Sequence, residues 1–232
     1  MATAPTSTMV TAGDVLAAQA TASHLGLILN TGVIFLHGMM SGASLGYSGL
    51  VLPHHLDPHS NLVLLTQDQA TWFNSLTPLA MGLAVFLSIP ASELLGRKKM
   101  FLLSSLISLA GYIMLYLAPS FLSLLAGRGV QCLGLGLGAM TTGVYLSEIS
   151  SVRLRGPLIG CSQTSFCLGV LAYTAACSAL PMDLLALVLA GHAALTFLLE
   201  LMLPESPQWL ARQAGREEDL RRSLLTLRFG IV

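Results

Sequence analysis

The chain has 232 residues and no formal net charge, with 54% hydrophobic and only 9% charged residues. Its mean hydropathy is +0.74. A soluble domain carries about 25% charged residues, so this composition excludes an ordinary soluble domain and predicts a protein of the lipid bilayer, while zero net charge gives no sign of a nucleic-acid partner.

The first residues form a lead-in that is rich in Ala and Thr. Residues 1–24 contain neither Lys nor Arg, which argues against a cleaved signal peptide and against an Arg-rich mitochondrial presequence. We therefore expect a cytosolic lead-in over residues 1–26, followed by a first apolar span that serves as an uncleaved anchor.

Long stretches without charged residues mark the candidate membrane spans. A membrane helix needs about 20 mostly apolar residues. The sequence predicts six such helices within residues 27–203 and the start of a cytosolic linker helix in residues 204–232, with the spans at 27–49, 72–92, 100–118, 122–147, 157–178 and 183–203.

The basic residues predict the orientation of these spans. Of the eleven Lys and Arg residues, all except Arg128 fall between spans two and three, between spans four and five, or after span six. By the positive-inside rule this side is cytosolic. Both ends of the chain are then cytosolic, and the loop over residues 53–68 lies outside.

Six motifs follow one another along the chain and together resemble the first half of the sugar porters of the major facilitator superfamily. Several positions depart from the family pattern: Ile89 replaces a Gly, Glu93 an Asp, Leu94 an Arg, Gly143 a Pro and Gln208 an Arg, and Thr164, Phe166 and Cys167 also differ. The motifs are WFNSL at 72–76, IPASELLGRK at 89–98, GRGVQCLGLG at 127–136, VYLSEI with RLRG at 144–156, Gln163 with GVLAY at 163–173, and PESPQWL at 204–210.

This resemblance implies an all-α membrane protein with half of a major facilitator superfamily fold, built from six transmembrane helices as two inverted three-helix repeats. It implies transport of a hexose or trehalose by alternating access at the plasma membrane, and the first span is similar to the arthropod facilitated trehalose transporter branch. The alternative is a truncated, non-transporting half. It would act as a homodimer or as an interaction or dominant-negative subunit of full-length porters, or be retained in the endoplasmic reticulum.

The resemblance also implies a conformational latch at the cytosolic ends of the spans. In the family, residues at the positions of Glu93, Arg97, Glu148, Arg155 and Glu205 form ion pairs that tie the helices together and break when the cavity opens inward. The alternative is that these are solvated loop charges that anchor the topology.

Gln163 is the principal candidate for sugar binding, because an amide both donates and accepts hydrogen bonds. By resemblance, Leu45, Ser48, Phe166 and Val170 would line the same cavity. For Gln163 alone, an interhelical hydrogen bond remains the other interpretation.

Two charged residues lie within the predicted spans. An unpaired Arg in a membrane is costly, so Arg128 is a candidate functional charge, with snorkelling to the outer interface as the alternative. Glu200 lies four residues before Pro204, and we expect it to snorkel to the inner interface, with a role in proton coupling as the alternative. His37 and His192 are expected to be packing or hydrogen-bonding residues.

The predicted outer loop contains His54, His55, Asp57 and His59, which have the ligand chemistry of zinc. Nothing marks a fixed ligand geometry, so the sequence predicts no metal site and no cofactor. Gly-rich phosphate loops, nucleophile elbows and metalloprotease motifs are also absent from the sequence, which argues against an enzyme.

Overall fold

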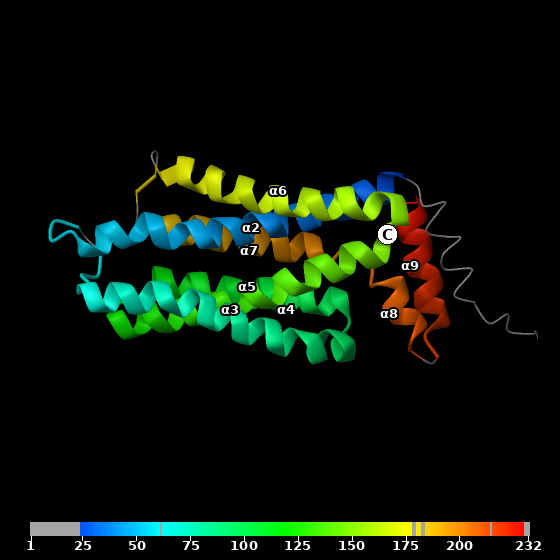
Figure 1. Ribbon diagram of the computed structural model, residues 1–232, viewed down its shortest axis with the longest axis horizontal. Coiled ribbons are helices and arrows are strands. Elements are labelled where there is room, and N and C mark those ends of the chain that lie inside the picture. The colour runs from blue at the N-terminus through cyan, green and yellow to red at the C-terminus, as the bar shows by residue number, and fades with distance from the viewer. Residues whose placement is uncertain (1–23, 61, 178–179, 182–183, 214, 230–232) are drawn as a thin grey trace, which may run out of the picture.

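The computed structural model describes residues 24–60, 62–177, 180–181, 184–213 and 215–229, a region whose regular structure is helical (Figure 1). The helices, in chain order, are α2 (His24–Leu56), α3 (Gln67–Leu95), α4 (Arg97–Tyr116), α5 (Phe121–Ile149), α6 (Val152–Cys177), α7 (Leu185–Glu200), α8 (Pro207–Ala211) and α9 (Glu217–Phe229).

Five of these helices, α2 to α6, are long and apolar enough to cross a membrane, and α7 is a shorter apolar helix. The predicted all-helical membrane fold with six apolar helices is therefore confirmed. Of the predicted lead-in, residues 1–23 lie outside the described part, and α2 begins at His24. It also continues past the predicted span to Leu56, with Pro53 in its last turn.

Local sequence signals set several helix ends. Thr66 and Ser120 each form a capping box at the start of α3 and α5, in which the side chain accepts a hydrogen bond from the backbone N–H three residues later. Gly96 has φ +89°, a conformation that side-chain-bearing residues rarely adopt. This glycine lets α4 start directly after α3 ends.

The packing of the six apolar helices is reciprocal between the first three and the last three. The first helix, α2, packs along α6, which is the second helix of the later group; α5, the first helix of that group, packs along α3. In addition, α4 contacts both α5 and α7. This is the pattern expected of two related three-helix units.

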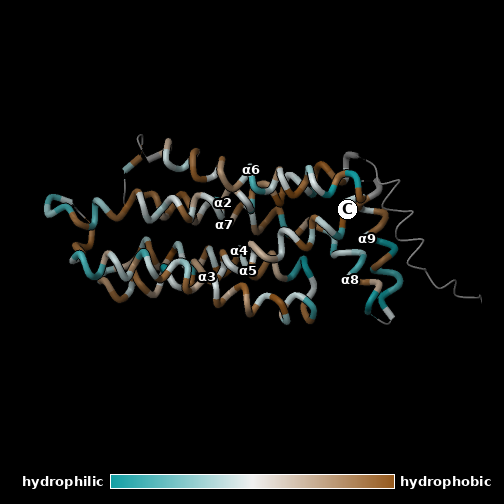
Figure 2. The backbone as a smooth tube through the Cα atoms, in the orientation of Figure 1, coloured by the Kyte–Doolittle hydropathy of each residue, from teal (hydrophilic) through white to brown (hydrophobic). Residues whose placement is uncertain are grey.

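The helices run nearly side by side, and α8 and α9 lie across one end of the bundle (Figure 1). We call this the α8–α9 end. The tube is mainly white to brown along the bundle, whereas hydrophilic segments appear on α9 and in the loop at the opposite end (Figure 2). Leu227 of α9 is buried against the bundle with Leu27, Phe101 and Tyr145, so apolar packing holds α9 in place.

Close contact of α2 with α6 depends on two glycines. A Cβ at Gly42 would collide with the carbonyl of Phe166, and a Cβ at Gly169 would lie 2.7 Å from the Cα of Met39. Small residues let membrane helices approach closely. Positions 42 and 169 therefore bring α6, with Gln163, against α2.

Candidate functional site

A cavity of about 170 Å³ lies among α2, α3, α5 and α6. Its walls combine apolar side chains with several hydroxyl groups and one amide: Gly38, Ser41, Met81, Leu135, Ala139, Thr142, Ser162, Gln163 and Phe166. Gln163 itself is exposed. An apolar pocket with a few polar groups is the usual form of a small-molecule site.

The predicted sugar-binding residues do not all line one cavity in the structure. Gln163 and Phe166 line this cavity together. Ser48 is buried elsewhere and accepts a hydrogen bond from Arg128, while the Leu45 side chain is 47% exposed. Val170 packs against Gly46 where α6 meets α2.

Sequence reasoning missed the hydroxyl groups of the cavity. Ser41 Oγ donates to the carbonyl of His37 at 3.1 Å, and Thr142 Oγ1 donates to the carbonyl of Gly138 at 2.9 Å. Because each hydroxyl proton is used within its own helix, the oxygen remains able to accept a hydrogen bond. Together with the Gln163 amide, these oxygens suit a ligand rich in hydroxyl groups.

A second polar group surrounds Arg128, whose side chain is fully buried. Its guanidinium donates to Thr77 Oγ1 at 3.0 Å, to Gln131 Oε1 at 2.9 Å, to the carbonyl of Ser44 at 3.2 Å and to Ser48 Oγ. Burial excludes snorkelling of Arg128 to the outer interface. The residue instead joins α2, α3 and α5 in the interior of the bundle.

The charge of Arg128 is stabilised without a carboxylate. Among the described residues its hydrogen-bond partners are all uncharged, and its guanidinium carbon lies 5.7 Å and 5.6 Å from the ring centres of Tyr47 and Phe73. Aromatic faces attract a desolvated cation. Hydrogen bonds and ring faces therefore replace the counter-ion that a buried Arg usually has.

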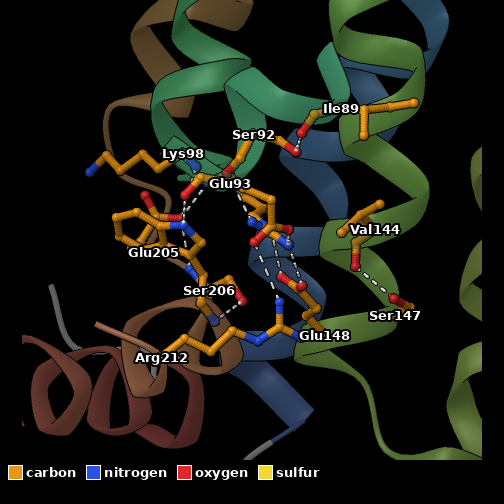
Figure 3. A network of polar contacts seen from close by, with 12 residues as sticks. Ile89, Ser92, Glu93, Lys98, Val144, Ser147, Glu148, Glu205, Ser206 and Arg212 are labelled. Carbon is orange, nitrogen blue, oxygen red and sulfur yellow. Dashed lines mark hydrogen bonds and ion pairs between the residues drawn. The ribbon is translucent and has the colours of Figure 1, made fainter. Parts of the chain in front are cut away.

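A third polar network, which includes Glu93, Glu148 and Glu205, occupies the α8–α9 end (Figure 3). Arg97 forms its central contacts. Arg97 Nη2 lies 2.8 Å from Glu148 Oε1 and 2.9 Å from Glu93 Oε1, and its Nε donates to Glu148 Oε2 at 3.0 Å. The Arg97 and Glu148 side chains are 3% and 7% exposed. This arrangement links α3, α4 and α5.

Glu205 joins the same network through backbone groups. Its Oε1 accepts hydrogen bonds from the amides of Arg97 at 2.7 Å, Lys98 at 3.0 Å and Ser206 at 2.9 Å. A carboxylate at a helix N-terminus is stabilised by the free N–H groups and the helix dipole. Glu205 thus ties the segment after α7 to the start of α4.

The departure at Gln208 is followed one helical turn later by a basic residue. Arg212 Nη1 lies 3.4 Å from Glu93 Oε2, and the indole N–H of Trp209 donates to the carbonyl of Glu93 at 2.8 Å. Both Arg212 and Glu93 are more than half exposed. The α8 segment therefore contacts α3 without the Arg that the family has at position 208.

Arg155, the remaining predicted latch residue, lies apart from this network. Its side chain is exposed near the start of α6, and the ion pairs found within the described ranges do not involve it. The structure thus groups four of the five predicted latch residues.

Glu200 differs from expectation. Its side chain is fully buried rather than snorkelled, and its Oε1 lies 2.7 Å from His37 Nδ1. His55, in the last turn of α2, forms a hydrogen bond between its Nδ1 and the carbonyl of Val63 at 2.6 Å, and in the loop that follows Asp57 Oδ1 accepts a hydrogen bond from the amide of His59. Within the described residues, no group of three or more potential ligands is placed to hold a metal ion.

Comparison with known proteins relates the sequence to transporters. The sequence profile of the family described as "Sugar (and other) transporter" matches residues 20–229. The human protein solute carrier family 2, facilitated glucose transporter member 6, is 33% identical over 190 residues, which are 81% of this chain and 37% of that protein. A facilitated trehalose transporter of Apis mellifera ligustica is 30% identical, over 82% of this chain and 38% of its own length.

Solved structures show the same fold. The proton:xylose symporter XylE bound to 6-bromo-6-deoxy-D-glucose superposes with a TM-score of 0.74 at 18% identity, over 87% of this chain and 49% of that one. A partially occluded inward-open form of XylE from E. coli gives 0.73 at 17% identity, over 86% and 55% of the two chains. The chain thus has the fold of about half of XylE and spans under two fifths of the two relatives above.

Proposed function

The chain belongs to the sugar transporter family of the major facilitator superfamily, and we propose that it forms the N-terminal six-helix half of a facilitative porter for a hexose or trehalose. In such porters the substrate site lies between two halves, which rock against each other to alternate access. The named relatives, a glucose transporter and a trehalose transporter, support these two substrate classes.

The observation that carries the proposal is the cavity that contains Gln163. Its amide stands beside the hydroxyl groups of Ser41, Thr142 and Ser162, with Phe166 and Met81 as apolar wall. A sugar presents hydroxyl groups for hydrogen bonding and C–H faces for apolar contact. This cavity is the half-site that the chain would contribute.

The network around Arg97 supports the conformational part of the proposal. It joins α3, α4, α5 and the segment after α7 at one end of the bundle through short charged contacts. Closing that end while the sugar cavity faces the opposite side requires contacts of this kind. Their rupture would permit the rocking motion, because an ion-pair network has two discrete states.

The orientation follows from the same end of the molecule. Arg97 and Lys98 lie in the first turn of α4, and Arg153 and Arg155 in the first turn of α6. Both helices start at the α8–α9 end (Figure 1), which would be cytosolic by the positive-inside rule. The loop between α2 and α3 would then face outside, and the membrane would be the plasma membrane.

The test combines sugar binding and sugar uptake. The chain is expressed in cells, its surface fraction is measured by biotinylation, and uptake of radiolabelled glucose and trehalose is compared with that of Gln163→Ala. Binding of the same sugars to the purified chain is measured in parallel. Gln213→Ala, which changes an exposed glutamine outside the cavity, is the matched control.

We expect saturable sugar binding that falls at least tenfold in Gln163→Ala and stays unchanged in Gln213→Ala. Loss of a hydrogen-bonding group from a sugar site has an effect of this size, since about 1.4 kcal/mol corresponds to tenfold. Equal binding by both variants would refute the assignment of Gln163.

Binding by a chain that reaches the surface without uptake would support the alternative, a non-transporting half that associates with a second copy or with a full-length porter. Most residues of α3 and α6 are not buried within the chain, so both helices, which border the cavity, would offer apolar surface to such a partner. Co-purification of two differently tagged copies distinguishes a homodimer from association with a porter.

A further inference from the structure

His37 of α2 and Glu200 of α7 form a polar pair in the interior of the bundle. The distance from His37 Nδ1 to Glu200 Oε1 is 2.7 Å, and the two side chains are 1% and 0% exposed. The ring of Phe101 lies edge-on to the imidazole, with 5.2 Å between the ring centres. The pair is therefore buried in the bundle and screened from water, with Phe101 against the imidazole.

Each member of the pair has a second polar atom that makes no hydrogen bond in the described part of the chain: His37 Nε2 and Glu200 Oε2. The imidazole Nε2 faces the backbone of Gly138, close to where a Cβ would stand, with Ser104 beside it. Ser104 Oγ already donates to the carbonyl of Gly134 at 2.7 Å. The two residues therefore depend on each other for stabilisation of charge.

Few other titratable groups face the pair from the surrounding helices. On α7, His192 Nε2 bonds the carbonyl of Leu36 at 3.1 Å, and on α4, Lys98 Nζ donates to the carbonyl of Leu201 at 2.7 Å. On α5, the hydroxyl of Tyr145 donates to the carbonyl of Pro204 at 2.9 Å. These three groups bond backbone carbonyls beside the pair rather than its side chains.

The remaining charges near this end are engaged elsewhere. Glu148 of α5 pairs with Arg97, and Glu205 accepts backbone N–H groups at the start of α4. From α9, the residues turned toward the bundle are Ser223, which donates to the carbonyl of Glu205, and Leu227. The net charge at the His37–Glu200 pair is therefore set by the protonation of these two side chains alone.

We propose that His37 and Glu200 form a binding site for a single proton, located within the membrane and occupied while α2 and α7 are packed together. Without a proton the pair carries one negative charge, and with two it carries one positive charge. Both states are costly in a buried site that lacks a counter-ion. With one proton, on the imidazole or on the carboxyl, the pair is neutral overall and keeps its hydrogen bond.

The route for this proton would run to the α8–α9 end. A cavity of about 180 Å³ there is bordered by Asn30 and Val33 of α2, by Leu199 and Leu203 on either side of Glu200 in the sequence, and by Thr226 of α9. Displacement of α9 would open this cavity to water and hydrate the pair. Release of the proton would therefore be linked to separation of α2, α7 and α9.

The test measures the thermal stability of the purified full chain between pH 7 and pH 9. In the unfolded chain ordinary imidazole and carboxyl groups have lost their protons in this range. The folded chain keeps one, so stability must fall as pH rises. One proton corresponds to a fall in Tm of about 3–5 °C per pH unit.

Glu200→Gln should abolish this slope, because a neutral amide beside a neutral imidazole needs no proton. His192→Gln, which alters another hydrogen bond of an imidazole between α7 and α2, should keep the slope. An equal slope in the wild type and Glu200→Gln would overturn the proposal. The measurement does not depend on sugar binding, so it remains informative if the proposed transport fails.

A second measurement uses the wild type alone and covers the case in which the variants do not fold. At pH 8.5, infrared and ¹⁵N-histidine spectra of the folded chain should show one carboxylic acid or one doubly protonated imidazole per molecule. Absence of both signals would mean that no proton is retained and would refute the site.

Discussion

Arg97 and Glu148 form a two-point ion pair between α4 and α5. Nε and Nη2 of the guanidinium meet the two carboxylate oxygens at 3.0 Å and 2.8 Å. The parallel geometry uses both oxygens of the acid and fixes its orientation. Because both side chains are almost fully buried, neither charge can be solvated by water if the other is removed.

Glu148→Gln should therefore destabilise the bundle strongly. The amide keeps one acceptor for Arg97 but leaves the buried cation with only the half-exposed Glu93 as a charge partner, and breaking a buried pair costs about 3–5 kcal/mol. We expect a lower Tm of the purified chain, measured by thermal unfolding in detergent.

The control for this variant is Glu93→Gln, which removes the other carboxylate bonded to Arg97. Glu93 is 53% exposed, and exposed pairs contribute only about 0–1 kcal/mol. A Tm loss as large in Glu93→Gln as in Glu148→Gln would show that burial does not set the strength of this network.

The close contact of α2 with α6 predicts how two glycine substitutions in α6 change the stability of the chain. In Gly169→Ala the added methyl would lie 2.7 Å from the Cα of Met39, a backbone atom that cannot move aside. Overpacking of this kind costs about 1–3 kcal/mol. Thermal unfolding should show the loss, and sugar binding should weaken as α6 carries Gln163 away from α2.

Gly160→Ala is the matched control on the same helix, because a Cβ there meets no atom within 4 Å. Alanine favours a helix over glycine by about 1 kcal/mol. This variant should therefore be as stable as the wild type or slightly more stable. A lower Tm would mean that glycine acts in α6 through flexibility rather than through close packing.

The hydrogen bonds of Arg128 predict that a positive charge alone at this position is not sufficient for the stability of the bundle. Arg128→Lys keeps the positive charge, but an ammonium has three donors and lacks the planar fork that reaches Thr77, Ser44, Ser48 and Gln131. Each buried acceptor left without a donor costs about 1–3 kcal/mol.

We expect Arg128→Lys to lower the Tm by more than Thr77→Val, which removes one acceptor and keeps the guanidinium. Thermal unfolding of the two purified variants compares them directly. If Arg128→Lys were as stable as the wild type, the positive charge rather than its hydrogen bonds would be the property that this site requires.

The sequence predicted the six apolar helices because a charge-free stretch of membrane length is a local signal. The resemblance to the sugar porters also implied ion pairs at the positions of Arg97, Glu93 and Glu148, which the structure brings together. The partners of Arg128 were not predictable in this way. Ser44, Ser48 and Thr77 come from helices whose packing no local pattern specifies.

Glu200 illustrates the same limit. Its position near the end of a span predicted snorkelling, because distance from the interface can be counted along the sequence. Which face of α7 it occupies depends on the packing of α2 and α4, and that packing places His37, 163 residues earlier, against its carboxylate. The prediction was wrong because helix rotation is a tertiary property.

Substitution of Arg155 can distinguish two roles of this residue, as a charge that anchors the topology or as a member of the latch. Its side chain is exposed and forms no ion pair with the described residues in this conformation. Arg155→Ala should therefore change the free energy of unfolding by no more than about 0.5 kcal/mol, as expected for a surface substitution, and the Tm should stay close to that of the wild type. Thermal unfolding measures this directly, with Glu148→Gln as the destabilised reference.

If the family role of this position holds in the chain, Arg155 pairs only when the helices rearrange. Arg155→Ala would then alter sugar uptake or accessibility of engineered cysteines at the α8–α9 end, while its Tm stays constant. A large fall in Tm would contradict the exposed position of Arg155, which forms no ion pair in the part of the chain that the structure describes. Unchanged uptake and accessibility together with an unchanged Tm would instead leave Arg155 as a topology anchor, because its charge still contributes to the positive-inside pattern.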